Sequence, residues 1–175
     1  RCYEAMIQYH VGVEAKAAEI HKLGKAELER LASEMQKIAA AEGFPTRADY
    51  ARALNQRAEH FLTSAEELLE HNRHLVEKAK ARLPQVFKTL PPWDVEVIPI
   101  ESYREQDSTA AYYYPGAKDQ TRPAYYYVNT YQPETRPLYN MEALAFHEAL
   151  PGHHLQISIA QTLPNIPELR RNIDQ

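Results

Sequence analysis

The chain has 175 residues and a formal net charge of −4. This length is sufficient for one domain with a core, and a 44% content of apolar residues excludes a wholly disordered chain. Lys and Arg are spread along the sequence, so nucleic acid is not expected as the main partner, because phosphate binding needs a concentrated basic face. The single cysteine, Cys2, excludes an internal disulfide framework. No stretch approaches the ~20 apolar residues of a membrane span.

The first half of the chain has the pattern of amphipathic helices. Apolar residues recur at steps of three to five over residues 20–38, which predicts one helix with an apolar stripe. A second helix is expected from the N-cap Thr46, and a third from Thr63 or Ser64, each of which has a glutamate three residues later. Short connectors between such helices favour an antiparallel bundle over residues 1–90. The stripe consists of Ile20, Leu23, Leu28, Leu31, Met35 and Ile38.

The second half, residues 91–175, changes character. A short strand is expected at 95–100, and two tyrosine-rich runs at 111–114 and 124–128 are bounded by Pro and Gly, which is typical of strands. A helix follows from Asn140. We therefore predict an α+β fold, mainly α, in which a helical bundle leads into a small antiparallel sheet and a further helix. Since the sequence opens and closes in mid-pattern, we expect one continuous domain cut from a larger protein.

Three of the eight histidines lie within residues 147–154, next to a glutamate. Neutral imidazole is a preferred ligand of zinc, and a catalytic zinc site keeps three protein ligands and a water. Zinc makes that water acidic enough to supply hydroxide near neutral pH. A carboxylate beside the first histidine can accept the proton and pass it to the leaving group. His147 and Glu148 offer both parts, with Glu148 as the general base.

The spacing of this segment differs from that of a plain HExxH helix. The position four residues after His147 is Pro151, whereas His153 and His154 follow six and seven residues later. On a straight helix neither could share one zinc ion with His147. Pro and Gly interrupt helices. A break at 151–152 could therefore bring a later histidine back by one turn, to the place that the second histidine has in a plain HExxH helix. This interpretation favours His153 as the second ligand, with His154 as the alternative.

The segment 146–156 resembles the HEAxPGHHxQ signature of the bacterial DUF885 family, whose members are uncharacterised and related to the gluzincin metallopeptidases. Further stretches similar to the family lie at 19–24, 113–116, 122–123 and 127–131. The resemblance therefore covers nearly the whole chain. It implies a zincin-like metallopeptidase domain with zinc as cofactor and a peptide or small amide as substrate. It also makes a periplasmic, envelope or secreted location the expectation.

The resemblance further implies a third metal ligand, a glutamate on a following helix. No matching segment follows the histidines, and Glu168 stands in a poor helical context just after Pro164 and Pro167, so we do not assign it. The third ligand is expected beyond Gln175, and this chain alone is expected to be inactive. Two alternatives remain open: a metal hydrolase of non-peptide amides or esters, and a non-catalytic helical module for binding or scaffolding.

Five further residues are candidates for supporting roles. Tyr127 and Tyr131 lie in the family-like run and could stabilise an oxyanion, although most tyrosines in such runs simply pack a sheet. Asn129 could bind a substrate backbone group or shape a turn, and Arg122 could bind a substrate carboxylate or a surface partner. Gln156 could hold a histidine in the required tautomer.

Overall fold

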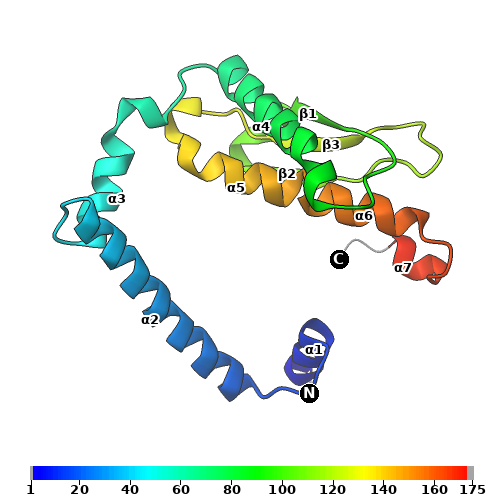
Figure 1. The fold of residues 1–175 in the computed structure, drawn as a ribbon, viewed down its shortest axis with the longest axis horizontal. Helices are drawn as coiled ribbons and strands as arrows, with labels where there is room; N and C mark the ends of the chain where they lie inside the picture. The colour runs from blue at the N-terminus through cyan, green and yellow to red at the C-terminus, as the bar shows by residue number, and fades with distance from the viewer. Residues whose placement is uncertain (1, 173–175) are drawn as a thin grey trace. The chain divides into compact units, whose positions relative to one another are not determined.

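A computed structural model describes residues 2–172 and shows a mainly helical α+β fold with one small sheet, as the sequence predicts (Figure 1). The chain divides into two compact units, Arg1–Arg57 and Ala58–Gln175. The helices of the first unit are α1 (Cys2–Val11), α2 (Ala17–Ala41) and α3 (Arg47–Gln56). None of the helices in the described part of the chain combines the length and apolar character that a membrane crossing requires.

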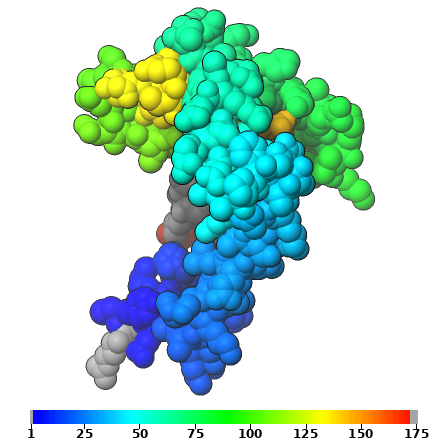
Figure 2. Space-filling model, turned by 90° about the vertical axis from the view of Figure 1, so that its left-hand side faces the viewer, coloured from blue at the N-terminus to red at the C-terminus, as the bar shows by residue number. Residues whose placement is uncertain are grey.

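In the first unit, local sequence signals set the ends of the helices. Glycine at position 43 adopts a φ of +80°, which ends α2, and Phe44 then packs on Tyr50 at a ring-centroid distance of 5.1 Å. The side chain of Thr46 accepts a hydrogen bond from the backbone N–H of Asp49, so the predicted N-cap of α3 is confirmed. Helices α2 and α3 are in contact (Figure 2). The predicted apolar stripe of α2 lies exposed, and among α2 residues only Ala39 is buried.

The second unit combines helices and strands. Its N-terminal helix α4 is capped by Ser64, whose hydroxyl accepts from the backbone N–H of Glu67, and this resolves the choice between Thr63 and Ser64. The elements are η1 (Ala58–His60), α4 (Ala65–Val86), β1 (Val95–Pro99), η2 (Glu105–Asp107), β2 (Ala111–Tyr114), β3 (Ala124–Val128), η3 (Pro133–Thr135), α5 (Leu138–Glu148), α6 (Gly152–Thr162) and α7 (Glu168–Asn172).

The three strands form a mixed sheet in the order β1-β3-β2. Strand β2 pairs antiparallel with β3, whereas β1 pairs parallel with β3. The prediction of a purely antiparallel sheet is therefore wrong for one of the two pairs. The physical reason is the order of the strands: the chain crosses from β1 to the far edge, forms β2, and returns as β3 in the centre. A strand that reverses β2 in this way runs in the direction of β1.

One face of the sheet carries the core of the second unit. Alternation along β3 buries Ala124, Tyr126 and Val128 on this face. Helix α4 packs against β1 and α5, and α5 packs against β2, so both helices lie on the same face (Figure 1). Burying a Leu such as Leu68 of α4 contributes about 1.5–3 kcal/mol. Helix α4, expected as the third helix of a bundle, thus belongs to the layer above the sheet.

Candidate metal centre

The helix that carries the histidine motif is broken, as the Pro-Gly pair suggested. Helix α5 ends at Glu148 and α6 begins at Gly152; between them lies the segment 149–151, whose last peptide bond, Leu150–Pro151, is cis. A Cβ atom added to Gly152 would lie 1.8 Å from the backbone oxygen of His147. Only glycine therefore lets α6 approach the end of α5 this closely.

The break places His153 beside His147. The two ring centroids are 4.9 Å apart with an interplanar angle of 88°. One ligand atom each from His147, Glu148 and His153 all lie within 4.8 Å of one another. Within residues 2–172 no other group of three or more His, Cys, Asp or Glu side chains comes this close. We call these three residues the motif cluster.

The carboxylate of the motif cluster is held by the edge of the sheet. Glu148 Oε2 accepts a hydrogen bond of 3.1 Å from the backbone N–H of Tyr113 on β2. The same oxygen lies 3.9 Å from His153 Nε2, and the Glu148 side chain is 14% exposed. The Tyr113 ring stacks on His153 with a centroid distance of 6.2 Å. Strand β2 therefore orients both the carboxylate and one imidazole.

His154 points away from the motif cluster and is fully buried. Its Nε2 lies 2.9 Å from the carbonyl oxygen of Trp93, and its Nδ1 lies 3.1 Å from the Tyr113 hydroxyl. A carbonyl only accepts, so Nε2 donates to Trp93 and Nδ1 accepts from Tyr113. Burial lowers the pKa of His154, which favours the neutral ring. Both nitrogens are engaged, so the geometry favours His153 as the metal ligand over His154.

The two tyrosines expected near the reacting groups lie elsewhere. Strand alternation directs Tyr127 to the face of the sheet opposite the core, where it stacks on Tyr112 at 4.6 Å with the Arg104 guanidinium 5.5 Å from its ring. The Tyr131 hydroxyl accepts a 3.0 Å hydrogen bond from Gln106 Nε2. The structure does not bring either side chain to the motif cluster.

Asn129 and Arg122, the expected substrate-binding residues, stabilise loops in the structure. Asn129 is buried; its Nδ2 donates to three carbonyl oxygens in 105–109, and its Oδ1 accepts from the Tyr131 N–H. Arg122 donates to the carbonyls of Pro115 and Pro123 and covers a tyrosine ring. Neither residue belongs to the motif cluster.

Gln156, proposed to hold a histidine, is exposed on α6. Within residues 2–172 the partners of the buried histidine are Tyr113 and Trp93 instead. The sequence interpretation missed Tyr113 because all three tyrosines of its run look alike. The available signal was the alternation of side chains along a strand. Tyr112 and Tyr114 point to the other face, so Tyr113 is the only tyrosine of β2 on the buried face.

The donor set of the motif cluster suits a divalent metal ion. The two imidazoles of His147 and His153 are ligands that zinc accepts, with the Glu148 carboxylate beside them, and a tetrahedral site with bonds of ~2.1 Å separates its ligand atoms by ~3.4 Å. Ligand atoms already within 4.8 Å reach that spacing by small side-chain rotations. Glu168 on α7 is not a member of the cluster. The residues present therefore fit a metal ion, with a further ligand still to be supplied.

Comparison with known proteins places the chain in a family. The sequence model of the family described as "Bacterial protein of unknown function (DUF885)" matches residues 1–174. A crystal structure described as that of "the putative lipoprotein from Colwellia psychrerythraea" is similar, with a TM-score of 0.84 and 27% identity. The match covers 90% of this chain and 28% of that chain, so this chain spans less than a third of its neighbour. A search of curated proteins gave no match. The chain therefore belongs to the DUF885 family of bacterial proteins.

Proposed function

We propose that this chain carries part of the active site of a zinc-dependent hydrolase that cleaves peptides. The observation that supports this most is the motif cluster: a helix break places the ligand atoms of His147, Glu148 and His153 within 4.8 Å of one another. The close approach of α6 to His147 that forms this cluster requires glycine at position 152, because a Cβ there would lie 1.8 Å from the His147 backbone oxygen. A chance group of surface side chains would have no such requirement.

His147 and His153 are the residues that would hold the metal ion, each through a neutral ring nitrogen. When bound, zinc acts as a Lewis acid toward a carbonyl and lowers the pKa of water. His153 is held by stacking on Tyr113, and His147 is the more exposed of the two rings. The ring of His147 therefore has more freedom to adjust, while that of His153 is set by the fold.

Glu148 is the proposed general base. The Tyr113 N–H binds Oε2, which directs the carboxylate and leaves Oε1 to take a proton from the attacking water. The water oxygen bonds to the substrate carbonyl carbon, and the proton passes from Oε1 to the leaving nitrogen as the C–N bond breaks. Glu148 thus begins and ends the cycle as a carboxylate.

The third protein ligand is proposed to lie outside this chain, on a part of the longer protein. Within residues 2–172 the motif cluster contains two imidazoles and the base, which is one ligand short of a catalytic zinc site. The structural neighbour is more than three times as long as the matched region, which leaves ample chain for that ligand. We expect the isolated chain to bind zinc weakly and to be inactive.

For the location and the substrate we propose only a broad class. The neighbour is described as a "putative lipoprotein", and this favours an envelope or secreted location for the present protein. A peptide amide is the favoured electrophile, because the motif resembles that of metallopeptidases. Turnover measured on a panel of peptides, esters and non-peptide amides distinguishes these substrate classes.

The test is zinc content and turnover of the full-length protein. We expect about one zinc ion per chain after zinc supplementation, and loss of turnover with retained zinc in Glu148→Gln. Glu142→Gln, which removes an exposed carboxylate from the same helix, is the matched control and should leave turnover unchanged. A zinc content below ~0.1 per chain, or full activity in Glu148→Gln, would overturn the proposal.

A further inference from the structure

A small pocket lies among α4, β3 and the start of α5, and no residue of the motif cluster lines it. Its volume is about 130 Å³. The most deeply buried lining residues are Leu68, Asn72 and Tyr126, each at most 2% exposed, so they form its floor. Thr135 and Asn140 are exposed, so the pocket opens to solvent between η3 and α5.

Arg136 carries the only formal charge among the described residues that line this pocket, which we call the Arg136 pocket. Its Nε donates a 2.8 Å hydrogen bond to the carbonyl oxygen of Tyr131, which anchors the guanidinium. Within residues 2–172 its other two nitrogens have no hydrogen-bond or ion-pair partner. Burial lowers the pKa of Arg136, and the more distant Glu105 acts in the opposite direction. A partly desolvated cation with unused donors favours an anion.

The polar groups on the floor of the pocket are already hydrogen-bonded. Asn72 Nδ2 donates to the carbonyl oxygen one turn earlier on α4 at 2.9 Å, and its Oδ1 accepts from the Tyr126 hydroxyl at 3.0 Å. The amide of Asn129 is engaged by the loop 105–109. Met141 and Leu144 of α5 add apolar surface. The depth of the pocket therefore suits an apolar group rather than a polar one.

The volume and the helix at the opening narrow the choice of ligand. A cavity of ~150 Å³ holds one benzene-sized molecule, so the slightly smaller Arg136 pocket suits an apolar tail of about four to six carbon atoms. Pro137, the N-cap residue of α5, also lines the pocket, and no side chain of the described residues caps this helix. The positive end of the α5 dipole therefore lies at the same opening as Arg136 and adds to the attraction for an anion.

From these observations we propose that the Arg136 pocket binds a small monocarboxylate with an apolar tail of about four to six carbon atoms. The carboxylate pairs with the guanidinium of Arg136, and the tail lies against Tyr126 and Met141. No described lining residue is acidic, so the ammonium group of an amino acid would have no partner there. The pocket therefore prefers a simple carboxylate to an amino acid of the same shape. This site does not rest on the proposed hydrolase activity.

Methyl NMR of the full-length protein with 4-methylpentanoate tests the proposal. The methyl signal of Met141 should shift to saturation with a Kd on the order of 1 mM, as expected for so small a ligand. Met6 and Met35 lie in the other unit and should not shift, which makes them internal controls. The uncharged 4-methylpentanamide and the amino acid leucine should bind about tenfold more weakly. Equal affinity for the acid and the amide, or no shift of Met141 at ~20 mM acid, would overturn the proposal.

Variants of the lining give a second test. Arg136→Gln should weaken binding of the acid about tenfold and leave the affinity for the amide unchanged. Arg82→Gln, which removes an exposed arginine of α4 outside the lining, is the matched control and should bind as the unmodified protein does. Leu144→Phe fills the space of the tail without touching Arg136 and should abolish binding of both compounds. Unchanged affinity for the acid in either lining variant would refute the site. Neither readout requires zinc or turnover, so failure of the hydrolase proposal leaves this one standing, and the reverse also holds.

Discussion

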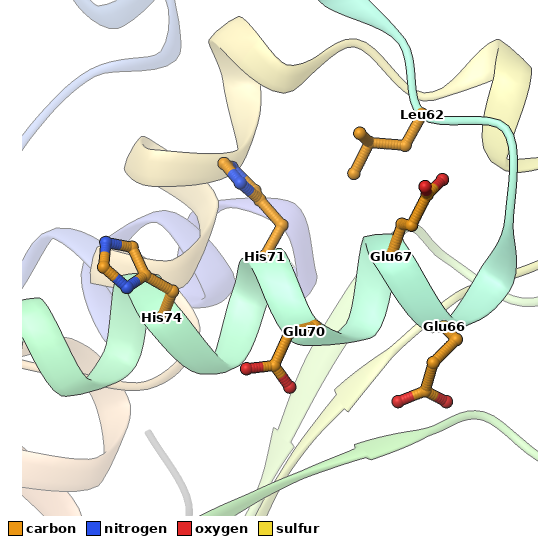
Figure 3. Close-up of a pocket in the computed structure, with 6 residues that line it drawn as sticks. All are labelled: Leu62, Glu66, Glu67, Glu70, His71 and His74. Carbon is orange, nitrogen blue, oxygen red and sulfur yellow. The ribbon is translucent and has the colours of Figure 1, made fainter.

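The motif cluster and the α4 histidine pair present similar donors on different backbones. In the motif cluster, His147 and His153 are six residues apart and meet only because the helix breaks between them. On α4, His71 and His74 are neighbours through the ordinary helical turn (Figure 3). The arrangement of the motif cluster therefore depends on tertiary structure, through Gly152 and the edge strand β2, whereas the spacing of the α4 pair depends on one continuous helix. This difference predicts that changes around the motif cluster have far larger effects.

The largest effect is expected for Gly152→Ala. The new Cβ would lie 1.8 Å from the His147 carbonyl oxygen, so α6 must move away from α5. We expect the free energy of unfolding to fall by about 3 kcal/mol or more, together with loss of zinc binding in the full-length protein. Chemical denaturation measures the first and metal analysis the second. Gly24→Ala in α2 is the matched control: nothing lies within 4 Å of its added Cβ, and a gain of up to ~1 kcal/mol is expected.

Tyr113→Phe should have the next largest effect. The change removes the hydroxyl that hydrogen-bonds Nδ1 of the fully buried His154, and an unsatisfied buried acceptor costs about 1–3 kcal/mol. Tyr127→Phe, on the opposite face of the same sheet, should change the free energy of unfolding by less than ~0.5 kcal/mol. Urea titration of both variants compares them, and equal losses would contradict the placement of Tyr113.

A smaller effect is expected from pH. Burial lowers the pKa of His154 below that of the unfolded chain, so the unfolded state binds a proton first on acidification. Stability should therefore be fully present above the unfolded pKa of ~6.5 and fall as the pH drops through it. Urea unfolding of the metal-free chain at pH 8 and pH 5.5 measures the change. His154→Leu should flatten this dependence, whereas His21→Leu on the exposed surface of α2 should not.

Much of the fold follows from local sequence signals. The caps Thr46 and Ser64, the strands and the helix break after Glu148 could all be predicted, since each depends on residues within a turn or two. The preference for His153 over His154 also came from local spacing. The engagement of His154 within the fold could not be read from that spacing, because its Nε2 donates to the carbonyl oxygen of Trp93, which is distant in the sequence.

The parts that could not be predicted depend on long-range placement. Strand order decides whether β1 and β3 run parallel, and no local signal encodes it. The face on which Tyr127 lies depends on the register of β3 against its neighbours, and a shift of one residue would exchange it with Tyr126. The burial of Asn129 likewise depends on the loop 105–109 folding over it.

The most direct test of the central claim is anomalous diffraction at the zinc edge from crystals of the zinc-loaded full-length protein. The account predicts one peak ~2.1 Å from a ring nitrogen of His147 and of His153, with His154 still bonded to Trp93 and a third ligand from outside this chain. A peak on His154, or the absence of any peak at the motif cluster, would contradict it.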